Sequence, residues 1–273
     1  MAAREATTPE HVRIQAGEVA LHVARWRADA PPLLLLPAMT QTWADWLPVV
    51  PFFTTHFDVA AVDLRGHGES DHPAARFRVR DYAADVFVLT AALGWTDAAR
   101  PAVIGHSLGG TIAQFTEAAY PRWSQRIIIE DSPLQLDYRD RRATLLAKAY
   151  LRMYERPMAE IEAHFRRRHA DWSAAQVRDA ALASRATAPA VLHEYLAHEP
   201  LTLDETLLGI HCPVLLVYGD EESGGFVSDA DVATYLAALP EGRAVQIPGA
   251  GHSIHARKPD AFAAVVLPFL LSD

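Results

Sequence analysis

The stretch Ala102-Val-Ile-Gly-His-Ser-Leu-Gly-Gly110 decides the fold. It places a serine in the spacing Gly-x-Ser-x-Gly, directly after a short aliphatic run and directly before a stretch with helical spacing. A strand, a sharp turn and a helix in this order present the serine oxygen at the top of a sheet. Small flanking residues let strand and helix approach closely, and the helix N-terminus then faces any developing negative charge. The stretch therefore predicts a nucleophilic Ser107 in an α/β fold.

The rest of the chain repeats this alternation of strand-like and helix-like stretches. Two short strands with a turn at Gly17-Glu18 are expected first. Aliphatic runs of strand length then lie at 32–36, 57–64, 102–105, 126–130, 214–218 and 244–247, and helical spacing is seen at 79–93, 111–120, 229–239 and 259–271. Continuous short aliphatic runs are typical of strands that are buried on both faces. Their alternation with helices predicts an α/β fold with a mainly parallel sheet.

One segment, residues 133–208, interrupts this alternation. It contains no aliphatic run of strand length and is rich in Ala, Arg, Leu and Glu with helical periodicity. It is far longer than an ordinary connection between a helix and a strand. We therefore expect a core formed by residues 1–132 and 209–273, with 133–208 as an inserted helical cap, or lid.

Composition excludes several classes of function. The chain has 273 residues, a formal net charge of −9, 50% apolar residues and 22% charged residues, as is usual for a soluble protein. The acidic balance argues against nucleic acid as a partner, because phosphate backbones require clustered Lys and Arg. A single cysteine, Cys212, permits no internal disulfide and indicates a reducing compartment.

Neither a membrane location nor a bound cofactor is expected. Residues 1–10 lack the apolar segment of a signal peptide, and no apolar run approaches the ~20 residues that span a bilayer. The predicted location is the cytoplasm. A zinc site requires close pairs such as His-x-x-x-His with a third ligand, whereas His164 and His169 are five residues apart on an expected helix and lie on different faces; His193 and His198 repeat that spacing. No phosphate-binding or dinucleotide motif occurs. We therefore predict no metal and no cofactor, a small-molecule substrate, and a monomer or homodimer.

Two motifs together resemble those of a known family. The serine stretch and Asp63-Leu-Arg-Gly-His-Gly-Glu-Ser70 are similar to the α/β-hydrolase superfamily, as an esterase-like serine hydrolase with a helical lid. The resemblance extends from about residue 11 to 271 and is weakest over 133–208. It implies the α/β-hydrolase fold, in which a mainly parallel sheet is flanked by helices. It also implies a catalytic triad in the chain order nucleophile, acid, histidine.

The resemblance implies which residues complete the triad. His252, in Ala250-Gly-His-Ser253, follows the last expected strand and corresponds to the Gly-His signature of the catalytic base. His255 is expected to face the cap or the first turn of a helix.

Three carboxylates are candidates for the acid. The favoured one is Glu222, because relatives usually carry the acid three residues after a glycine, here Gly219. Asp220 is the second candidate. Asp131 is the third, since some relatives take the acid from the end of the strand that here covers 126–130.

The oxyanion hole is expected to use two backbone N–H groups. One belongs to Leu108, after the nucleophile, and the other to Met39, after the strand at 32–36. Relatives usually have His-Gly where this chain has Pro37-Ala38, and alanine adopts a positive φ less readily than glycine. The departure puts the loop geometry in question. Trp43, on an expected short helix, is a candidate for the acyl pocket, with core packing as the alternative.

The position next to the nucleophile, His106, is assigned to the substrate pocket, with packing as its alternative role. A serine nucleophile disfavours epoxide hydrolase or haloalkane dehalogenase chemistry, because those relatives use aspartate at this position. The predicted reaction is hydrolysis of a carboxylic ester or a lactone. The alternatives are carbon–carbon bond hydrolysis in a diketone-type acid and a non-catalytic, ligand-binding member of the fold.

Overall fold

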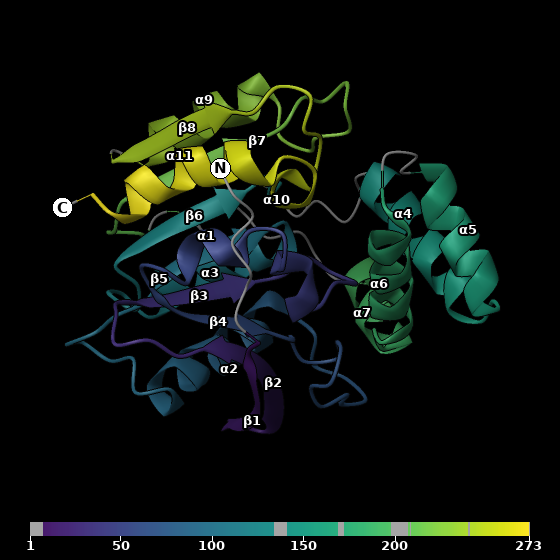
Figure 1. The fold of residues 1–273 in the computed structure, drawn as a ribbon, viewed down its shortest axis with the longest axis horizontal. Helices are drawn as coiled ribbons and strands as arrows, with labels where there is room; N and C mark the ends of the chain where they lie inside the picture. Colours follow the sequence, from purple (N-terminus) through teal and green to yellow (C-terminus); the bar gives the residue numbers. More distant parts are fainter. Residues whose placement is uncertain are drawn as a thin grey trace.

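An eight-stranded sheet forms the centre of the computed structural model, which describes residues 8–133, 141–168, 172–197, 207, 209–239 and 241–272 (Figure 1). The strand order is β1-β2-β4-β3-β5-β6-β7-β8. The strands are β1 (Glu10–Ala16), β2 (Val19–Trp26), β3 (Pro32–Leu36), β4 (Asp58–Val62), β5 (Ala102–His106), β6 (Arg126–Glu130), β7 (Val214–Tyr218) and β8 (Gly242–Gln246). The expected α/β-hydrolase arrangement of the sheet is confirmed.

Strand direction follows the connections. β1 and β2 form a hairpin around Gly17, whose φ of 65° suits the tight turn, and β2 also pairs antiparallel with β4. From β4 to β8 all pairs are parallel. Their carboxyl ends therefore meet at one edge of the sheet, where α/β proteins place their ligands.

Helices cover both faces of the sheet because the inner strands are apolar on both sides. Leu34 and Leu36 of β3 pack into one apolar cluster, and Leu33 and Leu35 pack into the other. On the first face lie α2 (Val79–Ala92), α3 (Leu108–Ala119) and α9 (Asp229–Ala238). On the second lie the 3-10 helix η1 (Trp43–Trp46), α1 (Val50–Phe53), α10 (Ile254–Arg257) and α11 (Pro259–Leu270).

Four helices lie between β6 and β7 in the chain. They are α4 (Arg141–Tyr154), α5 (Met158–Arg168), α6 (Ala174–Arg185) and α7 (Pro189–Ala197). Figure 1 shows them together at one side of the sheet, beyond the ends of the parallel strands. α4, α5 and α6 share a small apolar cluster of their own, formed by Met153, Ile161, Phe165, Val177 and Ala181.

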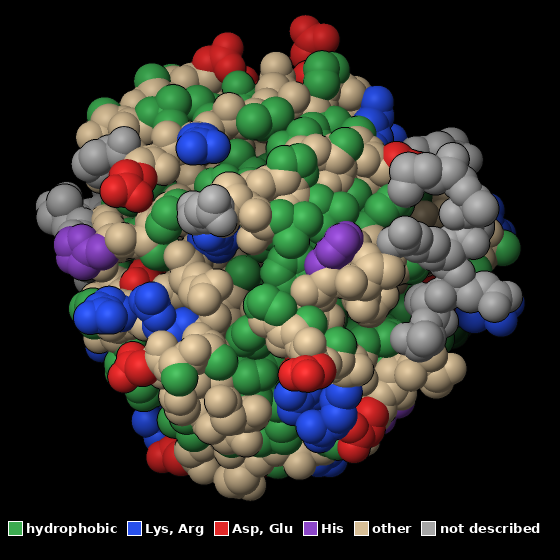
Figure 2. Space-filling model, turned by 60° about the vertical axis from the view of Figure 1, so that its left-hand side comes forward, with side chains coloured by type: hydrophobic (Ala, Val, Ile, Leu, Met, Phe, Trp, Pro, Cys, Tyr) green, Lys and Arg blue, Asp and Glu red, His purple; other side chains and the backbone are tan. Residues whose placement is uncertain are grey.

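The expected division into core and cap stays a prediction. Residues 134–140, 169–171, 198–206 and 208 of the expected cap, and residues 1–7 of the expected core, lie outside the described residues. No helix within the described ranges is long and apolar enough to cross a membrane. On the face shown in Figure 2, Lys and Arg side chains lie near Asp and Glu side chains, with hydrophobic side chains between them.

Candidate active site

Ser107 lies at the turn between β5 and α3, as its motif predicts. Its φ of 50° and ψ of −114° lie in a region that a residue with a side chain rarely adopts. Two hydrogen bonds hold this backbone: the Ser107 N–H donates to the carbonyl oxygen of Glu130 (3.0 Å), and the Ser132 hydroxyl donates to the Ser107 carbonyl oxygen (2.7 Å). The neighbouring strand β6 therefore fixes the strained turn.

The glycines around Ser107 permit a close approach of backbone to backbone. A Cβ added to Gly109 would lie 2.1 Å from the carbonyl oxygen of Leu36, at the end of β3. One added to Gly105 would lie 2.4 Å from the carbonyl carbon of Gly109. The start of α3 thus packs directly on the end of β3, which brings Leu108 next to the loop that contains Met39.

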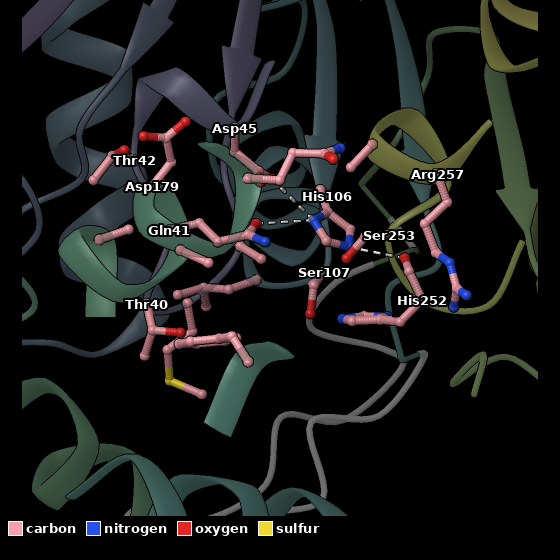
Figure 3. A pocket seen from close by; sticks show the side chains of 18 of the residues that line it. Thr40, Gln41, Thr42, Asp45, His106, Ser107, Asp179, His252, Ser253 and Arg257 are labelled. Atoms are coloured by element: carbon pink, nitrogen blue, oxygen red, sulfur yellow. Dashed lines mark hydrogen bonds and ion pairs between the residues drawn. The ribbon is translucent and has the colours of Figure 1, made fainter. Parts of the chain in front are cut away.

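His252 is paired with Asp131. Its Nδ1 lies 2.7 Å from Oδ2 of Asp131, whose side chain is fully buried at the end of β6. The same carboxylate oxygen accepts a hydrogen bond from the Phe226 N–H (2.8 Å), and Oδ1 accepts one from the Gly219 N–H (3.4 Å). An ionised Asp131 only accepts, so Nδ1 carries the proton and Nε2 is left with its lone pair. Figure 3 shows the Ser107 hydroxyl turned toward the His252 ring.

The expectation that Glu222 is the partner of His252 is wrong, and so is the second candidate, Asp220. Glu222 is exposed in the turn after β7 and lines a separate surface hollow with Asp220. Asp220 accepts hydrogen bonds from the Gly249 N–H and from the Ser223 hydroxyl. β6 and β7 are neighbours, and the carboxylate that pairs with His252 is the third candidate, Asp131, which directly follows β6.

The loop after β3 resolves the question raised by Pro37-Ala38. The residue with a left-handed backbone is Thr40, with a φ of 67°, and Ala38 is not among the positive-φ residues. The Gln41 N–H donates to the Ala38 carbonyl oxygen at 3.2 Å and closes the turn. Alanine is therefore accommodated where relatives have glycine. Met39 and Leu108 both line the cavity beside Ser107.

A cavity of about 710 Å³ opens over Ser107 and His252 (Figure 3). It is lined by side chains of α4, α5 and the segment before α6, among them Leu146, Tyr150, Phe165 and Trp172. The polar lining residues include Thr42, Asp45, Asp179 and Arg257. Such a combination of apolar side chains with a few polar groups is typical of small-molecule sites.

Of the two residues expected in the substrate pocket, His106 lines the cavity and Trp43 does not. The Trp43 ring packs edge-on against His11 and tilted against Trp26, and the backbone N–H of Trp43 donates to Oδ1 of Asp63 (2.8 Å). The alternative, core packing, is correct for this residue. The direction of a side chain on a short helix cannot be read from its position after a strand.

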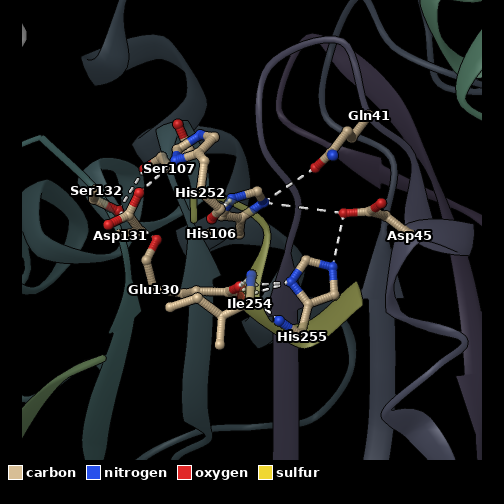
Figure 4. Close-up of polar contacts among 10 residues, drawn as sticks. All are labelled: Gln41, Asp45, His106, Ser107, Glu130, Asp131, Ser132, His252, Ile254 and His255. Atoms are coloured by element: carbon tan, nitrogen blue, oxygen red, sulfur yellow. Dashed lines mark hydrogen bonds and ion pairs between the residues drawn. The ribbon is translucent and has the colours of Figure 1, made fainter. Parts of the chain in front are cut away.

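Next to Ser107, His252 and Asp131 lies a buried polar cluster that sequence reasoning missed (Figure 4). His255 is fully buried; its Nδ1 faces both carboxylate oxygens of Glu130 (2.9 and 2.7 Å), and its Nε2 faces Oδ2 of Asp45 (2.9 Å). His106 donates from Nε2 to the carbonyl oxygen of His252 (2.9 Å). The available signal was a carboxylate directly before Asp131 and a second histidine three residues after His252.

Neighbouring charges and burial shift the pKa values of this cluster in opposite directions. Burial disfavours the charged form of His255, but the charges of Glu130 and Asp45 outweigh it and raise the pKa of His255 to about 10. Burial opposes ionisation of Glu130 as well, yet the His255 charge lowers the pKa of this carboxyl to about 2. For His106 burial prevails and lowers its pKa to about 4.

Asp45, His106 and His255 are also the described residues that could approach a metal ion together, with one ligand atom each within 4.8 Å of one another. Nε2 of His255, however, already lies at hydrogen-bond distance from Asp45. The cluster is therefore described by its hydrogen bonds rather than as a metal site.

Comparison with known proteins identifies the family. The model of the alpha/beta hydrolase family matches residues 33–265, and the chain belongs to this family of enzymes. A soluble epoxide hydrolase from Corynebacterium sp. (strain C12) is 42% identical over 82 residues, which are 30% of this chain and 28% of that protein. The chain thus matches less than a third of the length of this relative.

Other relatives match over nearly their whole length. The 2-(acetamidomethylene)succinate hydrolase of Mesorhizobium japonicum is 26% identical over 274 residues, covering 94% of each chain. The crystal structure of an E-2-(acetamidomethylene)succinate hydrolase has a TM-score of 0.81 at 24% identity and covers 97% of this chain and 100% of its own. An esterase, RhEst1 from Rhodococcus sp. ECU1013, has a TM-score of 0.78 at 21% identity and covers 97% and 99%. These structures share the fold.

Proposed function

We propose that this protein hydrolyses a carboxylic ester or lactone of a small molecule through an acyl-enzyme. The proposal rests chiefly on one observation: His252 is held by the buried Asp131 at 2.7 Å, beside a serine on a strained turn between strand and helix. This is the arrangement that activates a hydroxyl group, which is otherwise a weak nucleophile.

The first half-reaction forms the acyl-enzyme. The Ser107 oxygen attacks the carbonyl carbon of the substrate while Nε2 of His252 takes its proton, and Asp131 orients the imidazole and stabilises its charge. The N–H groups of Leu108 and Met39 donate to the oxyanion. Collapse of this intermediate breaks the carbon–oxygen bond, and the leaving alcohol takes the proton from His252.

The second half-reaction consumes water. His252 takes a proton from a water molecule, whose oxygen attacks the acyl carbon that is bonded to Ser107. The same two N–H groups stabilise the second oxyanion. Collapse returns the proton to Ser107 and releases the carboxylic acid, so no cofactor is required.

The cavity supports a substrate of small-molecule size. Its volume of about 710 Å³ falls within the range of ligand pockets. The apolar side chains of Leu146, Tyr150 and Phe165 favour an apolar acyl or alcohol group next to them.

Short p-nitrophenyl esters and a fluorophosphonate probe test the proposal. The wild-type protein should release p-nitrophenol catalytically, and the probe should add one phosphonyl group at Ser107, located by mass spectrometry of the peptide. Ser107→Ala should abolish both. A wild-type protein that shows neither turnover nor labelling would contradict the enzymatic assignment and favour the non-catalytic, ligand-binding alternative.

Carbon–carbon bond hydrolysis in a diketone-type acid is a second candidate, because it uses the same triad. Arg257 lines the cavity and offers a positive charge to a substrate carboxylate. Turnover of a vinylogous diketone acid at a higher kcat/KM than that of the uncharged esters would favour this alternative.

A further inference from the structure

We propose that His255 is a positioning residue for the hydrolysis proposed above. As an imidazolium bridge between Glu130 and Asp45, it fixes the segment that carries His252 against strand β6 and against η1 (Figure 4). The inference rests on the proposed function. It goes beyond the triad because His255 touches neither the substrate nor the reacting atoms in that mechanism.

The hydrogen-bond geometry requires a proton on each nitrogen of the His255 ring. Nδ1 lies 2.7 Å from Oε2 of Glu130, and Nε2 lies 2.9 Å from Oδ2 of Asp45. Ionised carboxylates only accept hydrogen bonds, so each ring nitrogen must donate. A cation between two anions is also the arrangement that makes burial of His255 and Glu130 tolerable. The raised pKa of His255 agrees with this geometry.

The Glu130 end of the bridge holds the chain just after His252. Oε1 of Glu130 accepts hydrogen bonds from the backbone N–H groups of Ile254 (2.6 Å) and His255 (2.9 Å), at the start of α10. On the other side, His106 holds the carbonyl oxygen of His252. The histidine segment is thus connected to the two residues that directly precede Ser107 and Asp131.

The Asp45 end of the bridge connects to the loop after β3. Asp45 belongs to η1, and the indole ring of its neighbour Trp46 stacks on the His255 ring at 4.4 Å. The turn that contains Met39 lies directly before η1 in the chain. Loss of the His255 charge would therefore allow the base and an oxyanion donor to shift relative to each other. Misplacement by about 1 Å can cost roughly 100-fold in rate.

The experiment compares His255→Gln and Glu130→Gln with Asp85→Asn. Asp85 of α2 is a matched control, because it is a buried carboxylate in an ion pair, with Arg65, outside the cavity. We would measure three properties of each variant: kcat and KM on a p-nitrophenyl ester, the rate of fluorophosphonate labelling, and the melting temperature. The kinetics are measured at a temperature at which every variant is folded.

His255→Gln should lower kcat about 10- to 100-fold and slow labelling in proportion, with KM changed less than about threefold. Glu130→Gln keeps an oxygen that accepts the two backbone N–H groups but removes the charge, so a smaller loss of kcat is expected. Asp85→Asn should lower the melting temperature and leave kcat within about threefold of the wild type. An active His255→Gln variant that loses only stability would overturn the inference.

The protonation state of the His255 ring can be observed by NMR in the wild type, so this test does not depend on whether His255→Gln folds. In the wild type labelled with 15N-histidine, the ring of His255 should show two protonated nitrogens at pH 8. In Glu130→Gln it should show one. A neutral His255 ring in the wild type at pH 8 would overturn the bridge even if the variants lose activity.

The activity of the wild type distinguishes failure of the proposed function from failure of the inference about His255. If the wild type neither turns over esters nor labels at Ser107, the proposed function fails. If the wild type is active and both variants match it, the inference about His255 fails alone.

Discussion

His106 and Glu130 are direct partners across the parallel strands β5 and β6, and each is followed in the chain by a residue of the candidate active site. His106 precedes Ser107, and Glu130 precedes Asp131. Both side chains contact the segment around His252: His106 donates to the His252 carbonyl oxygen, and Glu130 accepts from the Ile254 N–H. The strand ends thus position the proposed nucleophile, the acid and the histidine segment together.

The assignment of the acid predicts a sharp difference among carboxylates. Asp131→Asn should reduce kcat by about 10³- to 10⁴-fold, since an amide no longer favours the tautomer with a free Nε2. Steady-state kinetics of Asp131→Asn, Glu222→Gln and Asp220→Asn provide the measurement. The variants at positions 220 and 222 serve as controls and should stay within about threefold of the wild type, because these residues do not contact His252. A collapse of kcat in Glu222→Gln with an active Asp131→Asn would reverse the assignment.

The raised pKa of His255 predicts how stability depends on pH. Its pKa in the folded protein is about 10, above its ordinary value of 6.5, so folding favours the protonated form. The stabilisation is complete below pH 6.5 and is lost as the pH rises from 6.5 through 10. Urea unfolding at a series of pH values should show a steeper alkaline loss of stability in the wild type than in His255→Gln. The lowered pKa of His106, about 4, acts below this window. Parallel curves would contradict the prediction.

The contact between α3 and β3 predicts a costly substitution. In Gly109→Ala the new Cβ would lie 2.1 Å from the Leu36 carbonyl oxygen, a backbone atom that cannot rotate away. We expect a loss of about 3 kcal/mol in the free energy of unfolding. Gly94→Ala is the control: it has a φ of 80° but nothing within 4 Å, so roughly 1 kcal/mol is expected. Equal losses, measured by urea unfolding, would show that the close approach is absent.

Cys212 should react slowly in the folded protein. Burial raises the pKa of its thiol to about 12, and its sulfur lies 3.4 Å from the Ser124 hydroxyl oxygen. Since the thiolate is the reactive form, alkylation by iodoacetamide at pH 8 should be at least about 100-fold slower than in urea-unfolded protein. Mass spectrometry of timed samples measures both rates. Comparable rates would contradict a half-buried, protonated thiol.

The core of the fold was predictable because its inner strands are short and continuously apolar. Runs such as 32–36 and 214–218 are aliphatic throughout, and the structure places both in the sheet. The helix after Ser107 begins at Leu108, whereas the sequence predicted a start near residue 111. Glycines are typical of turns, so Gly109 and Gly110 were assigned to the turn, but in the structure they belong to the helix. Local sequence therefore predicted the elements better than their ends.

The carboxylate that pairs with His252 was less predictable for a geometric reason. β6 and β7 are neighbours, and both are followed by carboxylates, Asp131 after the first and Asp220 and Glu222 after the second. Which carboxylate meets His252 depends on the directions of two turns, which spacing in the chain does not specify. The partners of His255 come from segments far apart in the sequence, so only the folded chain brings them together.

Because Asp131, the partner of His252, follows β6, the side chains of the segment after β7 can be substituted without removing this partner. Residues 219–226 hold Asp131 through backbone N–H groups and contact His252 through the ring of Phe226 at 4.4 Å. Substitution of side chains in this segment therefore leaves Ser107, His252 and Asp131 unchanged. Ser223, Gly224 and Phe226 line the cavity. Ser223 and Phe226 are suitable positions for a focused mutant library in which substrate preference is redesigned while Ser107, His252 and Asp131 are kept, whereas the φ of 101° at Gly224 favours glycine.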